Sequence, residues 1–172
     1  MIILIILAVI VVLFGWVVFV GAPYLPSHSR EVKAAFRELY QLKPTDVLVD
    51  VGSGDGIILR LAAREGARAI GYEINPILVV ISWILARGNK RIQVKLTDFW
   101  QQPLSSETTI VYAFSVSRDV DKLAAKLQQE ANRLTKPLFL MTYGAPLRHR
   151  KATTKRRGHH LYEFVPLQQE KP

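Results

Sequence analysis

The sequence predicts an α/β protein with a doubly wound, mostly parallel sheet and an antiparallel last strand, preceded by one transmembrane helix. Three observations support this fold. After residue 44, short apolar runs alternate with amphipathic stretches; a glycine cluster follows the first of these runs; and the first twenty residues carry no charge. Strands that alternate with helices imply right-handed crossovers and a parallel sheet that is covered on both faces.

Composition limits the architecture and the chemistry. The chain has 172 residues, of which 49% are apolar and 22% charged, and this indicates one globular domain with a buried core. It contains no cysteine, which excludes disulfides, thiolate metal sites and a catalytic thiol. The net charge of +9 belongs entirely to the part after residue 20.

Residues 1–20, MIILIILAVIVVLFGWVVFV, contain neither charge nor proline. A helix needs roughly 20 apolar residues to cross a bilayer core of about 30 Å. A signal peptide would instead have a basic start and a shorter apolar stretch, and a buried core helix is a further alternative. Because Arg30, Lys33 and Arg37 follow the span and no charged side chain precedes it, the positive-inside rule places the domain on the cytoplasmic side. We therefore expect a single-pass membrane protein.

Residues 21–43 are expected to form a linker and a pre-domain helix. GAPYLPSHS is punctuated by prolines, and Val32, Phe36 and Tyr40 then recur at helical spacing. The sequence KPTD ends this helix, so the main domain is expected to span residues 44–172.

Within that domain, apolar runs predict parallel strands at 47–51, 68–73, 92–96, 109–114 and 137–143. Helices are predicted at 56–65, 76–87 and about 118–133. Asn75 is the expected cap of the second of these helices, and Pro76 its first residue. The last apolar segment, 160–167, has no helical spacer before it, so we expect it to pair antiparallel at or near an edge of the sheet.

The glycine cluster reads D-x-G-x-G-x-G over residues 50–56. Gly52, Gly54 and Gly56 allow a tight turn and a close approach to a ligand, because glycine has no Cβ. Asp50 would repel a pyrophosphate but suits a ligand with a cationic amine. The loop therefore favours S-adenosylmethionine over a dinucleotide, although an ordinary glycine-rich turn is the simpler alternative.

Two more acids follow the next strands of the predicted sheet. Glu73 ends the second strand, where a carboxylate can accept both hydroxyls of a ribose. Asp98 follows the third strand, where it can accept from an adenine amino group while Phe99 or Trp100 lies against the ring. Individually, Glu73 could be a solvated strand end and Asp98 a helix cap. The specific signal is that three acids fall at successive strand ends of one sheet.

With these residues the chain resembles the class I S-adenosylmethionine-dependent methyltransferases over roughly residues 44–143, in a minimal form of their Rossmann-like fold. The membrane span followed by PYLPS, VDVGSGDG, GYEINP and TDFW resembles the membrane-anchored protein-lysine methyltransferases of the ATP-synthase c subunit and the ADP/ATP carrier, and their prokaryotic relatives. The resemblance implies closure of the segment around Pro23, Tyr24 and Pro26 over cofactor or substrate. It implies cofactor contacts at Asp50, Gly52, Ser53, Gly54, Gly56, Glu73, Asp98 and Phe99.

Such an enzyme would most readily methylate a lysine of a membrane or membrane-associated protein. The sulfonium is already activated, so the protein must mainly align the nucleophile and exclude water. Tyr24 is the first candidate for orienting the amine through its hydroxyl, and Ser115 is the second. An anchoring role for Tyr24 at the membrane surface is an equal alternative.

Other functions remain open or are disfavoured. The missing cysteine excludes cytosine C5 methylation, and the segment 115–118 lacks the D/N-P-P-Y pattern of N6-adenine enzymes. RNA ribose methylation stays possible with Lys122, Lys136 or Asp119. A non-catalytic, membrane-tethered interaction module is the alternative from another class.

Two surface features lack an assigned role. The basic segment 148–157 could bind anionic lipid, RNA or an acidic protein, or be a solvated loop. The neighbouring histidines, 149, 159 and 160, have no acids or cysteines beside them, so no metal site is expected. The nearly all-apolar helix 77–86 is either core or a face that docks onto a bilayer or a membrane-protein substrate.

Overall fold

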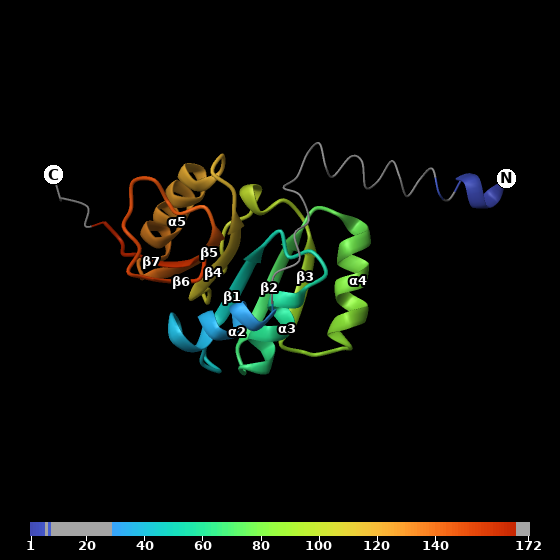
Figure 1. Ribbon diagram of the computed structural model, residues 1–172, viewed down its shortest axis with the longest axis horizontal. Helices are drawn as coiled ribbons and strands as arrows, with labels where there is room; N and C mark the ends of the chain where they lie inside the picture. The colour runs from blue at the N-terminus through green and yellow to red at the C-terminus, as the bar shows by residue number, and fades with distance from the viewer. Residues whose placement is uncertain (6, 8–28, 168–172) are drawn as a thin grey trace.

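The computed structural model describes residues 1–5, 7 and 29–167. It contains a seven-stranded sheet in the order β3-β2-β1-β4-β5-β7-β6 with helices on both faces (Figure 1). The strands are β1 (Val47–Val51), β2 (Arg68–Glu73), β3 (Ile92–Leu96), β4 (Ile110–Ser115), β5 (Leu138–Gly144), β6 (Thr154–Arg156) and β7 (His159–Phe164). The helices are α2 (Ser29–Glu38), α3 (Ile57–Arg64), α4 (Pro76–Ala86), α5 (Val120–Leu134) and the short 3-10 helix η1 (Phe99–Gln101).

The strand order reverses beside β1. This strand pairs parallel with β2 on one side and with β4 on the other, and the chain builds outward from it in both directions. In a doubly wound sheet, ligands bind beyond the carboxyl ends of the strands at such a switch point. The predicted α/β class and the mostly parallel sheet are confirmed.

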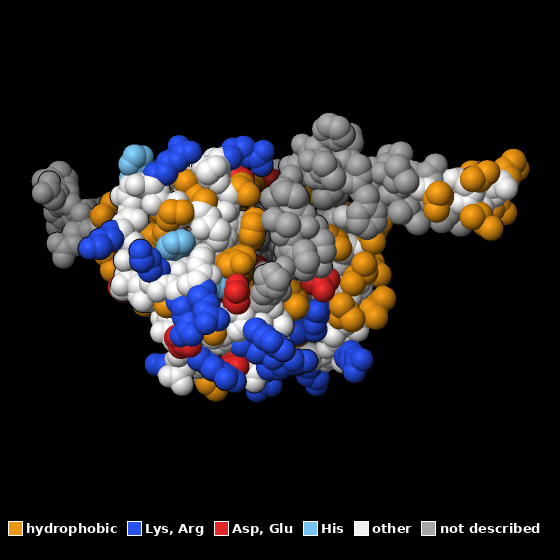
Figure 2. Space-filling view, viewed as in Figure 1, with side chains coloured by type: hydrophobic (Ala, Val, Ile, Leu, Met, Phe, Trp, Pro, Cys, Tyr) orange, Lys and Arg blue, Asp and Glu red, His pale blue; other side chains and the backbone are white. Residues whose placement is uncertain are grey.

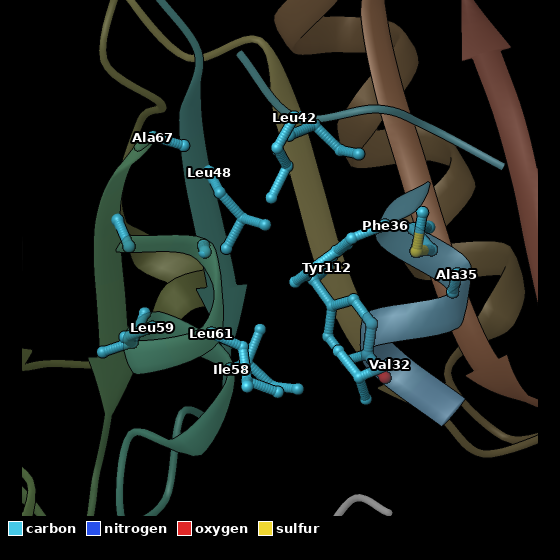
Figure 3. Close-up of a cluster of buried hydrophobic side chains, with 14 of the residues drawn as sticks. Val32, Ala35, Phe36, Leu42, Leu48, Ile58, Leu59, Leu61, Ala67 and Tyr112 are labelled. Carbon is cyan, nitrogen blue, oxygen red and sulfur yellow. The ribbon is translucent and has the colours of Figure 1, made fainter. Parts of the chain in front are cut away.

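Two cores cover the two faces of the sheet. Residues of α2, α3 and α4 pack on one face, and residues of α5 pack on the other. On the first face, Phe36 of α2 makes an edge-to-face contact with Tyr112 of β4, with ring centroids 6.2 Å apart (Figure 3). Val32, Ala35 and Phe36 are each only 1% exposed. The helix that we expected before the domain therefore packs into the domain core.

The carboxyl-terminal part contains one strand more than predicted. The last strand, β7, pairs antiparallel with β5 near the edge of the sheet, as expected, and the additional strand β6 pairs along its other side. Arg157 and Gly158 both have positive φ values, of 43° and 80°, and they form the tight turn between the two strands. Turns of this kind join antiparallel strands closely. Part of the basic segment 148–157 is therefore an edge strand.

No helix within the described residues has the length and apolar character needed to cross a membrane. Most of the predicted span, residues 6 and 8–20, lies outside the described part of the chain, as do Pro23, Tyr24 and Pro26.

Candidate functional site

The glycine loop lies at the switch point, between the end of β1 and the start of α3. Gly52, Gly54 and Gly56 have φ values of 69°, 55° and 78°, which L-residues with side chains rarely adopt. A Cβ at Gly52 would meet no described atom within 4 Å. The loop thus depends on glycine for its conformation, and at Gly52 no described atom blocks the approach of a ligand to the backbone.

Glu73 fixes the shape of this loop. The carboxylate is 6% exposed. Its Oε2 accepts a hydrogen bond of 2.8 Å from the backbone N–H of Gly54, and its Oε1 accepts one of 2.8 Å from the N–H of Asn75. A carboxylate offers about four acceptor positions, so each oxygen can still accept a second hydrogen bond. Glu73 can therefore hold the loop and still receive ligand hydroxyls.

Asp50 is the most buried acid of the site, at 3% exposure. Burial raises its pKa well above the usual range, and the nearby carboxylates of Glu73 and Asp55 raise the pKa further. A positive charge near Asp50 would favour its ionised form. The site is thus electrostatically suited to a cationic ligand. The described residues contain no group of three histidine or carboxylate side chains that could hold a metal ion.

Tight packing supports the loop from behind. A Cβ at Gly71 of β2 would lie 2.4 Å from Ser53 Oγ and 2.7 Å from Leu59 Cδ1. A Cβ at Gly56 would lie 2.1 Å from Oγ of Ser82 in α4. These glycines let the loop pack against β2 and let α4 pack against the start of α3.

Asp98 and Phe99 have structural contacts of their own. Asp98 Oδ1 accepts from the backbone N–H of Trp100 at 3.0 Å, so this acid caps η1. Of the two roles considered for Asp98, the helix cap is the one that the structure shows. Phe99 is 3% exposed and packs against Tyr72 and Trp100, with centroid distances of 6.0 and 5.3 Å. Its ring belongs to the hydrophobic core on the sheet face that α5 covers, close after the end of β3.

Ser115 ends β4 beside the switch point and is 5% exposed. Its Oγ donates a hydrogen bond of 2.6 Å to the carbonyl oxygen of Ala145, so the hydroxyl proton is engaged while the oxygen can still accept. The structure brings together Asp50, Glu73 and the glycine loop, and it places Ser115 on the neighbouring strand. Tyr24, the other predicted catalytic residue, lies outside the described residues.

The basic segment 148–157 is partly occupied by internal contacts. Arg148 donates to the Ser117 carbonyl oxygen at 3.0 Å, and Arg156 pairs with Glu38. Arg150 donates to the Glu163 carbonyl oxygen and lies 4.1 Å above the Phe164 ring. Lys151, Lys155 and Arg157 are exposed. These internal contacts could not be predicted from the sequence, because long-range arginine contacts leave no local pattern.

Several known proteins are similar in sequence to this chain. A Xenopus laevis protein, named as the lysine N-methyltransferase of the ATP-synthase c subunit, is 37% identical over 111 residues, which cover 63% of this chain and 48% of that protein. A protein-lysine N-methyltransferase of Saccharolobus islandicus is 29% identical over 113 residues, covering 63% of this chain and 69% of its own length. The chain thus spans about half the length of the first of these relatives.

A solved structure is similar over nearly its whole length. The RNA methyltransferase of Salinibacter ruber, in complex with S-adenosyl-L-homocysteine, has a TM-score of 0.71 and 26% identity, covering 86% of this chain and 98% of that chain. The family profile of the ANTKMT methyltransferase domain matches residues 50–137, which include the glycine loop, Glu73 and Ser115. The predicted resemblance is confirmed, and the chain belongs to the ANTKMT methyltransferase domain family.

Proposed function

We propose that this protein is an S-adenosylmethionine-dependent protein-lysine N-methyltransferase that acts on a membrane or membrane-associated protein. The observation that carries the proposal is the buried Asp50 beside a glycine loop that is hydrogen-bonded to Glu73 at the switch point of the sheet. The name of the Xenopus relative makes the ATP-synthase c subunit the first substrate to test.

The residues of the site fit this cofactor. Asp50 would face the cationic part of the ligand, because the carboxylate is buried among other acids and gains from a positive neighbour. Glu73 would receive the ribose hydroxyls on its remaining acceptor positions. Gly52 would let the ligand approach the backbone. Asp98 and Phe99 would border the adenine side of the site.

When bound, S-adenosylmethionine supplies a methyl group on a positively charged sulfur that is already activated for transfer. The protein must hold the lysine amine in line with that group and exclude water. Bringing an amine of pKa about 10.4 to its neutral form near pH 7 costs about 4.6 kcal/mol, and desolvation in the site offsets part of this cost. A dedicated base is then unnecessary. Ser115 Oγ could accept from the amine and orient it, as could the hydroxyl of Tyr24.

Residues 1–20 would anchor the protein as a single transmembrane helix, with the domain on the cytoplasmic side. The uncharged apolar stretch and the basic residues that follow it support this arrangement. An anchored domain would meet lysines that emerge from a neighbouring membrane protein.

The test has two stages and uses the full chain in detergent micelles. Calorimetric titration with S-adenosylmethionine should give saturable binding that is lost in Asp50→Ala and retained in Asp121→Ala, whose acid is exposed and pairs with Arg148. Labelled methyl groups should then enter the purified ATP-synthase c subunit, and they should not enter a variant of it whose lysines are replaced by arginine. Absence of cofactor binding by a folded chain would favour the non-catalytic module.

RNA methylation is the second candidate, because Lys151, Lys155 and Arg157 are exposed on the basic segment and the Salinibacter neighbour is an RNA methyltransferase. This function predicts labelled methyl incorporation into RNA and an RNA affinity that falls steeply with salt. Replacing these three residues with glutamine should abolish that affinity. Methyl transfer to protein alone would exclude this candidate.

A further inference from the structure

Helix α4 exposes apolar side chains over most of its circumference. Of its eleven residues only Val79 and Ser82 are buried. Figure 2 shows apolar side chains gathered over α4, which lies at the outer edge of the sheet beside β3 in Figure 1. The exposed apolar residues of this face are Ile74, Val80, Ile81, Trp83, Ile84, Leu85 and Leu96. We call these seven residues the α4 face.

An apolar surface of this kind requires a partner. A helix that is apolar all round is normally buried, and contiguous apolar patches on soluble surfaces mark sites of protein or membrane contact. Ile84 is 68% exposed and Trp83 55%, on adjacent positions. Because removal of apolar surface from water is favourable, covering the α4 face would stabilise a complex with its partner.

The charges around the α4 face identify the partner. Residues 74–97 contain no aspartate or glutamate. They contain four exposed basic residues, Arg87, Lys90, Arg91 and Lys95. Lys95 lies over the Tyr72 ring on the opposite face of the sheet, so Arg87, Lys90 and Arg91 form the basic rim of the α4 face. Tryptophan favours the membrane–water interface, and lysine or arginine beside a membrane binds anionic lipid headgroups. Each lysine or arginine near such a surface contributes about 1 kcal/mol, or roughly fivefold in affinity.

Position links this surface to the site. α4 begins at Pro76, close after Glu73, whose carboxylate accepts from the N–H of Asn75 at the start of the helix. The amino-terminal end of the α4 face therefore adjoins the rim of the candidate site. A surface lying on this face would also lie near the site.

We propose that the α4 face rests in the interface of an anionic lipid bilayer, with α4 along the membrane surface and its basic rim on lipid phosphates. This contact is separate from the predicted anchor and independent of which substrate is methylated. It orients the domain so that the site opens next to the bilayer, where a lysine of a membrane protein can reach it.

The absence of cysteine from the chain allows a direct test. Ile84→Cys in the full chain is labelled with a nitroxide and reconstituted into vesicles of phosphatidylcholine with phosphatidylglycerol. Power-saturation measurements compare collisions with oxygen, which concentrates in lipid, and with a water-soluble nickel complex. We expect oxygen collisions to dominate at residue 84. The matched control, Gln129→Cys on the exposed side of α5, should show nickel collisions dominating.

A second experiment tests whether the membrane contact depends on the basic residues and on anionic lipid. Arg87→Glu with Lys90→Glu should shift the label at residue 84 toward nickel accessibility in anionic vesicles, as should pure phosphatidylcholine vesicles. Nickel accessibility at residue 84 equal to that at residue 129 in anionic vesicles would overturn the proposal. Protection from both reagents would assign the face to a protein contact instead. Spin–spin broadening that disappears on dilution with unlabelled protein would identify a second copy, and protection only after substrate addition would identify the substrate.

Discussion

The backbone N–H of Gly54 donates a 2.8 Å hydrogen bond to Glu73 Oε2 and thereby joins the glycine loop to the neighbouring strand. The same carboxylate accepts from Asn75 at the start of α4. One acid therefore organises the loop after β1 and the turn after β2 before any ligand arrives. Because both contacts are buried, losing either leaves a backbone donor without its partner.

Glu73→Gln should weaken the site and the fold together. The amide has one accepting oxygen, so it can serve only one of the two backbone N–H groups, while its NH₂ group faces the other. We expect a loss of about 1–3 kcal/mol in unfolding free energy, measured by urea titration. Cofactor affinity in calorimetry should fall at least tenfold.

Glu107→Gln is the control, because Glu107 is exposed and forms a surface ion pair with Arg68. It should cost less than about 1 kcal/mol, and equal losses in the two variants would contradict the assigned role.

Asp50→Asn should stabilise the ligand-free protein at neutral pH. Burial and the nearby Glu73 and Asp55 raise the pKa of Asp50 above its unfolded value of about 3.9. A raised folded pKa gives stability that is present below the unfolded pKa and is lost as the pH rises through the folded pKa. The wild type should therefore lose stability relative to Asp50→Asn between about pH 4 and pH 7, at up to about 1.4 kcal/mol per pH unit.

Urea unfolding at pH 4 and pH 7 measures this difference. S-adenosylmethionine should reverse the ranking at pH 7 by stabilising only the wild type. The exposed Asp121→Asn serves as control and should track the wild type at both pH values. Parallel pH dependence in the wild type and Asp50→Asn would show that Asp50 titrates normally.

Gly56→Ala should lower the unfolding free energy by more than the positive φ value at this position alone explains. An alanine at φ 78° costs about 1–2 kcal/mol, and its Cβ would lie 2.1 Å from Ser82 Oγ. Gly88→Ala is the control, because Gly88 has a similar φ of 71° with no described atom within 4 Å of its Cβ position. Chemical denaturation should show a larger loss at Gly56.

A second substitution separates the backbone strain at position 56 from the steric clash with Ser82. In Ser82→Ala the nearest side-chain atom to the new Cβ is Ser82 Cβ, at 3.2 Å, so the excess cost of Gly56→Ala should shrink toward that of Gly88→Ala. Ser82 Oγ is buried and has no hydrogen-bond partner among the described residues, so Ser82→Ala alone should change stability little. An undiminished excess in the double variant would exclude the collision.

The sequence predicts the architecture well where structure follows local patterns. Apolar runs bounded by turn residues predicted β1 to β5 within one or two residues of their observed bounds, and Asn75 caps α4 as predicted, with Oδ1 accepting from the N–H of Ile77 at 2.9 Å. The candidate acids Asp50 and Glu73 could be singled out because the parallel strands of such a sheet end at one edge.

What the sequence did not predict depends on contacts between distant residues. β6 is short, basic and not apolar, so only its pairing with β7 makes it a strand. The internal contacts of Arg148 and Arg150 likewise depend on the packing of α5 against β7.

His159 should make stability fall on acidification. The side chain is 1% exposed, and its Nε2 lies 3.1 Å from the hydroxyl oxygen of Tyr112. Burial lowers its pKa below the ordinary value of 6.5, while the charge of Glu31 on α2 opposes the shift and that of His160 adds to it. A lowered folded pKa gives stability that is present above the unfolded pKa and is lost as the pH falls through the folded pKa.

Asp50 titrates in the opposite direction, so His159 is best measured in the Asp50→Asn background. Unfolding free energy in this background should fall from pH 7.5 to pH 5.5, by up to about 1.4 kcal/mol per pH unit below about pH 6.5. His159→Gln removes the titrating group and should flatten this part of the profile, whatever its effect on stability at pH 7.5. His160→Gln is the matched comparison, because burial also lowers the pKa of His160, and it should flatten the profile less since His160 is less buried. If His160→Gln flattened the profile and His159→Gln did not, the acid sensitivity would belong to His160 and not to His159, whose ring packs against those of Tyr112 and Tyr143.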